Sequence, residues 1–152
     1  MRILFVCTGN TCRSPMAEAL LREKLKGVPG TEVKSAGVAA FDGDKASENT
    51  LLVLAQRGIT LEHSARRLTD ELMEWADLVL TMTKGHKGMI CNLYPGQVDK
   101  VYTLKQYVGW QGDEDVADPF GGSLEVYAQC ADELEQLLEK LSKMLTEAQA
   151  EK

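Results

Sequence analysis

Short apolar runs alternate with longer amphipathic runs along this chain. The short runs predict buried strands at Ile3–Val6, Glu32–Ala36, Leu78–Met82 and Lys100–Tyr102. The longer runs predict helices at Pro15–Leu25, Asn49–Gln56, Asp70–Trp75, His86–Leu93 and Ser123 to about Ala148. Thr69 and Ser123 are the expected N-cap residues of two of these helices.

Strands that alternate with helices favour right-handed crossovers and a parallel sheet covered on both faces. We therefore expect a single α/β domain over residues 1–152, a doubly wound four-stranded parallel sheet with helices on both faces. Ligands of such folds bind beyond the carboxyl ends of the strands. The turn from Cys7 to Ser14 follows the first strand directly, so it is a candidate site.

Composition and charge narrow the classes of function. The chain has 152 residues, of which 44% are hydrophobic and 26% charged, as in an ordinary globular protein. A net charge of -6 argues against nucleic acid or an anionic membrane as a partner held by bulk charge. No apolar run approaches the roughly 20 residues that span a bilayer, and we expect a cytoplasmic protein.

Four cysteines are expected to be free thiols in a reducing compartment. Cys91 and Cys130 lie within helical patterns and are expected to fill the core. Cys7 and Cys12 are separated by four residues, at the edge of zinc-ligand spacing, but neither a second pair nor a nearby histidine completes a tetrahedral set. We expect neither a metal nor a cofactor.

The residue types in the turn after the first strand favour an anion nest, a concavity of backbone N–H groups that point inward. Gly9 can supply a backbone geometry that other residues resist, and Asn10 tolerates a left-handed conformation. The following helix adds its positive end, and Arg13 adds a planar donor fork suited to phosphate. A cysteine at such a position is stabilised as the thiolate, so Cys7 is the expected nucleophile.

These groups together predict phosphoryl transfer. In-line attack by Cys7 would form a phosphocysteine, while backbone N–H groups and Arg13 would bind the equatorial oxygens. Positioning and electrostatics do most of the work in such reactions, so the positive field of the loop can stand in for a metal ion.

The segment C-T-G-N-T-C-R-S-P, from Cys7 to Pro15, resembles the phosphate loop of the low-molecular-weight protein tyrosine phosphatase family. The resemblance covers nearly the whole chain. Further matching segments are Ser35-Ala36-Gly37, His63-Ser64-Ala65-Arg66, the third strand from Ala76 to Met82, and Asp118-Pro119.

The resemblance implies a role for each matching residue. Cys7 would be the nucleophile, Arg13 the phosphate clamp and Asp118 the general acid. The substrate-binding residues would be Thr8, Gly9, Asn10, Thr11, Cys12, Ser14 and Phe120, with Ser14 also donating a hydrogen bond to the thiolate, Asn10 shaping the loop, and Ser35 and His63 bracing it from behind.

Pro119 supports the role of Asp118 as the general acid independently of the resemblance. Proline biases the preceding residue towards an extended backbone and away from a helix. The alternative is that Asp118 merely opens a turn. Asp113 and Asp115 are rival carboxylates, but neither precedes a proline.

Other residues have simpler interpretations. Cys12 is either an incidental small residue or a thiol that traps oxidised Cys7 as a disulfide. His86 is expected at the surface with no role, whereas Trp75, Trp110 and the leucines of the closing helix (Leu134, Leu137, Leu138 and Leu141) are expected in the core.

Two departures from the tyrosine-specific pattern concern the substrate. The tyrosine phosphatases usually carry Ile or Leu where this chain has Thr11, and an aromatic pair after the Asp-Pro where it has Phe120-Gly121-Gly122. These features resemble the bacterial protein arginine phosphatases, and the expected partners are phosphorylated proteins. Threonine offers a hydroxyl to a polar guanidinium, on which Phe120 could stack.

Three alternatives accompany this hypothesis. The first is a tyrosine phosphatase. The second is an arsenate reductase or redox protein on the same fold. A reductase of this kind would need a close relay pair of thiols, where this chain offers only Cys91 and Cys130, which are widely separated. The third is a phosphopeptide-binding module, which would not need Asp118.

Overall fold

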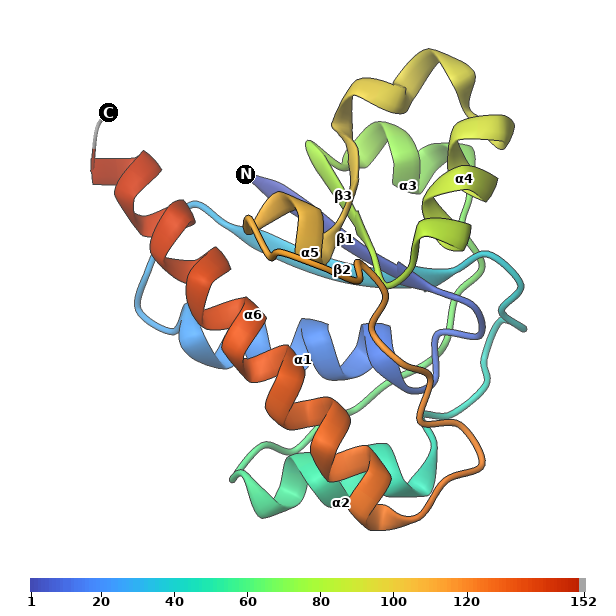
Figure 1. Cartoon of the computed structure of the whole chain (residues 1–152), viewed down its shortest axis with the longest axis vertical. Coiled ribbons are helices and arrows are strands. Elements are labelled where there is room, and N and C mark those ends of the chain that lie inside the picture. The colour runs from blue at the N-terminus through green and yellow to red at the C-terminus, as the bar shows by residue number, and fades with distance from the viewer. Residues whose placement is uncertain (151–152) are drawn as a thin grey trace.

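The computed structural model describes residues 1–150, in which a four-stranded sheet lies between two layers of helices (Figure 1). The strands are β1 (Arg2–Cys7), β2 (Glu32–Gly37), β3 (Leu78–Thr81) and β4 (Val101–Thr103). They pair in parallel in the order β2-β1-β3-β4. The predicted parallel sheet is therefore confirmed.

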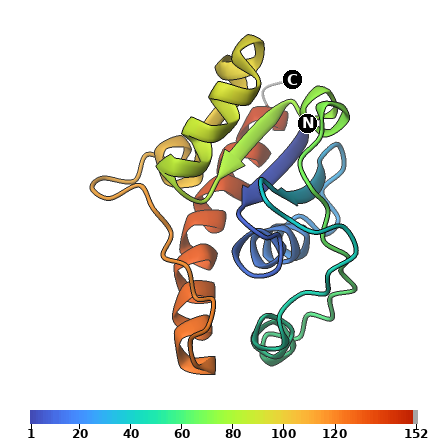
Figure 2. The same cartoon turned by 90° about the vertical axis from the view of Figure 1, so that its right-hand side faces the viewer.

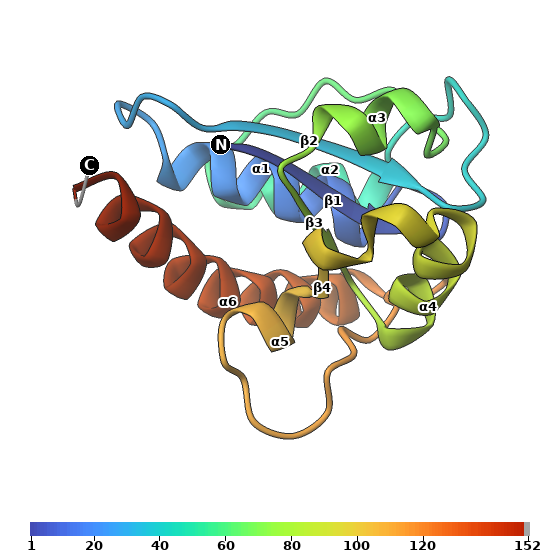
Figure 3. The ribbon, with the colours of Figure 1, turned by 90° about the horizontal axis from the view of Figure 1, so that it is seen from above.

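Helices cover both faces of the sheet. The helices are α1 (Arg13–Lys24), α2 (Glu48–Gln56), α3 (Asp70–Trp75), α4 (Lys84–Leu93), the short 3-10 helix η1 (Pro95–Lys100), α5 (Leu104–Tyr107) and α6 (Leu124–Ala150). One face carries α1, α2 and α6, and the other carries α3 and α4 (Figures 1 and 3). The longer helices match the predicted ones within a few residues, but η1 and α5 are too short to show a helical period and were not predicted.

None of the helices in residues 1–150 combines the length and the apolar character needed to cross a membrane.

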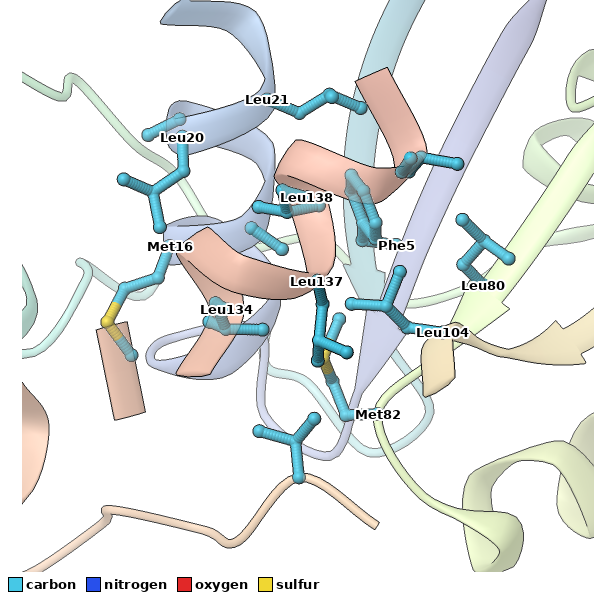
Figure 4. Packing of buried hydrophobic residues seen from close by; sticks show 14 of the residues in the cluster. Phe5, Met16, Leu20, Leu21, Leu80, Met82, Leu104, Leu134, Leu137 and Leu138 are labelled. Atoms are coloured by element: carbon cyan, nitrogen blue, oxygen red, sulfur yellow. The ribbon is translucent and has the colours of Figure 1, made fainter. Parts of the chain in front are cut away.

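The central strands β1 and β3 bury both of their faces. Along β1, Ile3 and Phe5 belong to the cluster under α1 and α6, whereas Leu4 and Val6 belong to the cluster under α3 and α4, and all four are fully buried. This alternation follows from the period of two along a strand. Figure 4 shows the larger cluster, in which leucines of α6 and α1 pack around Phe5.

The closing helix packs as expected, since Leu134, Leu137, Leu138 and Leu141 are fully buried. The expectation for Trp110 was wrong. Trp110 is 37% exposed, and the ammonium groups of Lys105 and Lys140 lie over its ring. These cation–π contacts stabilise the ring at the surface and not in the core. Trp75 is half-buried against the cluster under α3 and α4.

The end of the edge strand β2 lies directly against the loop that follows β1. Gly37 ends β2, and a Cβ atom added there would lie 2.5 Å from the carbonyl oxygen of Thr8 and 2.9 Å from the backbone nitrogen of Asn10. Only a residue without a side chain fits at this point. The loop after β1 is therefore held against the backbone of β2.

Replacing Gly37 with Ala should lower the free energy of unfolding by roughly 1 to 3 kcal/mol, because the methyl group must displace backbone atoms. Urea unfolding measures the change. Gly88→Ala is the matched control, since its Cβ would meet nothing within 4 Å on the exposed face of α4. That variant should be neutral or more stable by up to about 1 kcal/mol. Equal stabilities of the two variants would contradict the close contact.

Candidate active site

The loop from Cys7 to Ser14 joins the carboxyl end of β1 to the first turn of α1. Within residues 1–150, no protein atom accepts a hydrogen bond from the backbone N–H groups of Thr8 to Ser14. Successive N–H groups without protein acceptors at a helix N-terminus form an anion-binding concavity. The loop can therefore bind a phosphoryl group.

Asn10 supplies the unusual backbone geometry of the loop. Its φ of 58° is left-handed, and among the described residues it is the only non-glycine with a positive φ. Its side-chain amide donates to the Oγ atoms of Ser14 and Ser35, both at 2.9 Å, and its Oδ1 accepts from the Arg66 backbone at 3.0 Å. Every polar group of the buried amide is thus satisfied, and the loop conformation is stabilised.

The expectation for Gly9 was wrong. Its φ lies outside the left-handed region, and an added Cβ would have Thr11 Oγ1, at 3.7 Å, as its nearest neighbour. The local strain falls on Asn10, whose short amide can make hydrogen bonds that glycine cannot.

Ser35 and His63 hold Asn10 from outside the loop. Ser35 Oγ donates to Glu18 Oε1 at 2.6 Å, and Glu18 is in turn paired with Arg22 at 2.7 Å. His63 Nε2 lies 2.7 Å from the carbonyl oxygen of Asn10, to which it donates. Sequence reasoning did not single out Glu18, because a carboxylate within a helix looks like a surface residue until its burial is known.

Cys7 and Ser14 face each other across the loop. Cys7 is 3% exposed, and its Sγ lies 2.8 Å from Ser14 Oγ. Asn10 donates to that same oxygen, and the Ser14 hydroxyl hydrogen can reach the sulfur or the Ala36 carbonyl, of which the carbonyl is farther away, at 3.5 Å. A hydrogen bond donated to sulfur stabilises a thiolate.

Arg13 connects the loop to a distant segment of the chain. Its side chain is 5% exposed, Nη1 donates to the Val116 carbonyl at 2.9 Å, and Nη2 lies 3.6 Å from Asp118 Oδ2. The planar guanidinium therefore stands between the loop and a carboxylate, where it can also meet an anion.

The acid loop, residues 109–123, joins α5 to α6 and is orange in Figure 2. Val116 anchors it in the core, with its N–H donating to the Met82 carbonyl at 2.8 Å. Lys105, only 5% exposed, donates to the Asp115 carbonyl at 2.9 Å and pairs with Glu133 of α6 at 3.1 Å. A buried lysine with these contacts fixes the loop, and its burial could not be read from the sequence.

Asp118 is exposed at the tip of this loop. Its Oδ1 accepts from the Phe120 backbone at 3.1 Å, while the Phe120 ring is 74% exposed. The rival Asp115 accepts from the Lys84 backbone instead, at 2.8 Å, and does not reach the cavity described next.

A cavity of about 220 Å³ lies between the first loop and the acid loop. Eight of the residues expected at the site line it: Cys7, Thr8, Gly9, Thr11, Cys12, Arg13, Asp118 and Phe120. The other four, Asn10, Ser14, Ser35 and His63, lie behind it in the hydrogen-bond network.

Cys12 touches a helix from the far end of the chain. Its Sγ lies 3.3 Å from the hydroxyl of Tyr127 and 3.6 Å from Ser47 Oγ. Burial, and next the contact with Cys12, raises the pKa of Tyr127. Neither Tyr127 nor Ser47 was expected at the site, since both follow ordinary helical patterns.

His86 is the clearest correction to the sequence analysis. It is 6% exposed in the first turn of α4, and its Nε2 lies 2.8 Å from Thr8 Oγ1. Burial and then the Arg13 guanidinium lower the pKa of His86 from 6.5 to about 4, against smaller opposing effects of Asp115 and Asp118. His86 is therefore neutral near pH 7.

Among residues 1–150, no three His, Cys, Asp or Glu side chains gather as a metal site would require. The positive groups at the cavity are those of the loop, the helix end and Arg13.

Known proteins share this sequence and structure. The model of the family described as low molecular weight phosphotyrosine protein phosphatase matches residues 2–151. A protein-arginine-phosphatase of Geobacillus stearothermophilus is 54% identical over 144 residues, covering 95% of each chain. The structure of the YwlE arginine phosphatase from that organism gives a TM-score of 0.94 at 53% identity, over 99% of this chain and 96% of that chain. A YwlE C7S mutant with a phosphorylated active-site serine gives 0.92 at 50% identity, over 96% of each chain.

The lowered pKa of His86 predicts a dependence of stability on pH. Between the two pKa values the unfolded chain binds the extra proton, so stability is complete above about pH 6.5 and is lost as pH falls towards 4. From about pH 7.5 to about pH 5, the free energy of unfolding of His86→Gln should fall by about 2 kcal/mol less than that of the wild type. Urea unfolding at each pH gives the free energy of unfolding of the wild type and of the variant as a function of pH. Parallel curves would contradict the lowered pKa of His86.

Proposed function

The chain belongs to the low molecular weight phosphotyrosine protein phosphatase family, and on that premise we propose that it hydrolyses phosphoarginine residues in proteins through a phosphocysteine intermediate. The observation that carries the proposal is that Thr11, with its hydroxyl group, lines the cavity between the first loop and the acid loop. The names of the relatives with about half of their residues identical support the same substrate.

The first chemical step transfers the phosphoryl group to sulfur. The Cys7 thiolate attacks phosphorus, a sulfur–phosphorus bond forms, and the phosphorus–nitrogen bond to the guanidine breaks. Protonated Asp118 gives its proton to the leaving nitrogen. Its place 3.6 Å from Arg13 puts this carboxyl beside the group that holds the phosphate.

The second step releases phosphate. Asp118, now a carboxylate, takes a proton from water as the water oxygen attacks phosphorus. The sulfur–phosphorus bond breaks, and the products are inorganic phosphate and the Cys7 thiolate. The phosphorylated serine of the YwlE mutant supports the proposal of a covalent intermediate at this position.

The loop and Arg13 stabilise the charge that develops in both steps. The N–H groups from Thr8 to Ser14 and the Arg13 fork bind the equatorial oxygens, and the buried setting strengthens these interactions. Asn10, Ser35 and His63 keep the loop in the binding geometry before substrate arrives. Ser14 stabilises the thiolate in the ground state and on departure.

The substrate side of the cavity favours a guanidinium. The hydroxyl of Thr11 and the carbonyl oxygen of the protonated Asp118 carboxyl can accept N–H groups of the substrate, and the exposed Phe120 ring can stack on its plane. The carbonyl of Thr11 accepts from Ser47 N and Thr50 Oγ1, at 3.0 and 3.1 Å, which fixes this wall.

Tyrosine phosphatase activity is the second candidate, because the family model carries that name and the loop chemistry is common to both substrates. The arsenate reductase alternative is not supported. Cys130 lies on α6 in the cluster on one face of the sheet and Cys91 packs against the cluster on the opposite face, so the two thiols cannot form a relay pair. Burial also raises the pKa of Cys130 to about 12.

A cytoplasmic location belongs to the proposal, since a nucleophilic Cys7 must stay reduced to act.

Replacing Cys7 with Ser should abolish turnover, while the loop and Arg13 continue to bind inorganic phosphate. Mass spectrometry after incubation with a phosphoarginine peptide should show a protein that carries one added phosphoryl group, because the weaker serine leaving group stalls the second step. Turnover above a few per cent of the wild-type rate would contradict covalent catalysis through Cys7.

Replacing Thr11 with Ile should give the cavity an aliphatic wall that favours a phenyl ring. The ratio of kcat/KM for phosphoarginine over phosphotyrosine peptides should fall by roughly tenfold, equivalent to about 1.4 kcal/mol. Both peptides are measured on one preparation, with Thr11→Ser as the control that keeps the hydroxyl. If both activities fall together at a constant ratio, Thr11 only shapes the loop.

A further inference from the structure

His86 and Thr8 form a pair that the proposed reaction does not yet use. Thr8 follows the nucleophile, is exposed and lines the cavity, whereas His86 comes from α4 and is almost fully buried. Their side chains meet at 2.8 Å, and Thr83 caps the helix that presents the imidazole, with its Oγ1 accepting from His86 N at 3.0 Å. The contact therefore joins the loop to a rigid element on the other side of β1.

The second ring nitrogen of His86 identifies the tautomer. Nδ1 is buried, and no atom of residues 1–150 bonds to it. A neutral imidazole carries one N–H, and an unpaired buried N–H is rarer and costlier than an unpaired acceptor. The proton therefore lies on Nε2, which donates it to Thr8 Oγ1.

This hydrogen bond fixes the position of the Thr8 oxygen. Of the two lone pairs of the hydroxyl, one is used by His86 and one remains. Thr8 makes no other side-chain hydrogen bond within the described residues. The remaining lone pair is available at the cavity wall, where it can accept an N–H group but has no partner on a phenyl ring.

The charged groups around the site are compatible with Thr8 Oγ1 as an acceptor for a guanidinium N–H. Arg13, Asp115 and Asp118 are the charged groups that act on His86, from α1 and the acid loop. A guanidinium above the phosphate would meet acceptors on both sides, Asp118 on the acid loop and Thr8 on the first loop.

We propose that His86 is a positioning residue that fixes the hydroxyl of Thr8, and that Thr8 accepts a guanidinium N–H of the substrate and so adds to selectivity for phosphoarginine. The inference rests on the proposed function, because it concerns the leaving group and not the phosphate. Loss of this acceptor leaves the guanidinium N–H unpaired in the cavity, and sites built around such hydrogen bonds discriminate strongly.

The experiment compares four variants with the wild type, using kcat/KM for a phosphoarginine and a phosphotyrosine peptide of the same sequence. Thr8→Val removes the hydroxyl at nearly constant side-chain shape, and His86→Leu removes the N–H group that donates to this hydroxyl. Thr8→Ser keeps the hydroxyl, and His86→Gln keeps an N–H donor at the end of the side chain. Inhibition by inorganic phosphate and the melting temperature are measured for each.

The first two variants should lower the phosphoarginine over phosphotyrosine ratio by roughly tenfold each. In Thr8→Ser and His86→Gln, the phosphoarginine over phosphotyrosine ratio should stay within about twofold of the wild-type ratio. The double variant Thr8→Val/His86→Leu should lose no more than either single variant, because the two residues act through one hydrogen bond. Inhibition by phosphate should be unchanged, since the anion nest is intact.

Other outcomes overturn the inference. If Thr8→Val keeps the wild-type ratio, the hydroxyl does not contact the guanidinium, whatever happens to the His86 variants. If both activities and phosphate inhibition weaken together, the pair only supports the loop. A wild-type protein that prefers the phosphotyrosine peptide would instead contradict the proposed function itself, so the two failures are distinguishable.

Discussion

Backbone N–H groups without a protein acceptor, gathered in one loop, are the constraint around which this structure is built. Among the described residues, those from Thr8 to Ser14 have no protein acceptor, so they repel one another when no anion is bound. The loop keeps its shape because contacts reach it from several elements. Gly37 lies against its backbone, Asn10 and His63 hold its middle, and His86 holds its start.

The parallel sheet explains how residues far apart in the sequence meet at this loop. The carboxyl ends of β1, β2 and β3 share one edge, so the segments that follow them surround the nucleophile. Arg13 then ties the first loop to the Val116 carbonyl and to Asp118 of the acid loop. One guanidinium therefore connects the two loops, so a shift of either loop changes the cavity between them.

Short apolar runs were sufficient to predict the sheet, and amphipathic runs to predict the longer helices. The residues of the cavity were predicted from the motif from Cys7 to Pro15 and from Asp118-Pro119, through their resemblance to a known family. Burial of isolated polar residues is different. His86 and Lys105 look like surface residues in the sequence, because their partners, Thr8 and Glu133, are decided only when the helices pack.

The same reasoning explains the smaller errors. Gly9 was expected to supply an unusual backbone geometry, but of the two residues only Asn10, for which the sequence also allowed it, is left-handed, and its amide makes three hydrogen bonds. Trp110 was expected in the core, although the ammonium groups of two lysines lie over its ring. In both cases one partner, Ser35 for Asn10 and Lys140 for Trp110, comes from a distant part of the sequence.

The contact between Cys12 and Tyr127 has a consequence for the order in which the site forms during synthesis and folding. Cys7 precedes α6 in the order of synthesis, but one wall of its loop is a hydroxyl from that helix. The acid loop also precedes α6 and is tied to it through Lys105, which donates to the Asp115 carbonyl and pairs with Glu133. The nucleophile is therefore made before the helix that completes its surroundings, and both loops reach their full set of contacts only once α6 has docked.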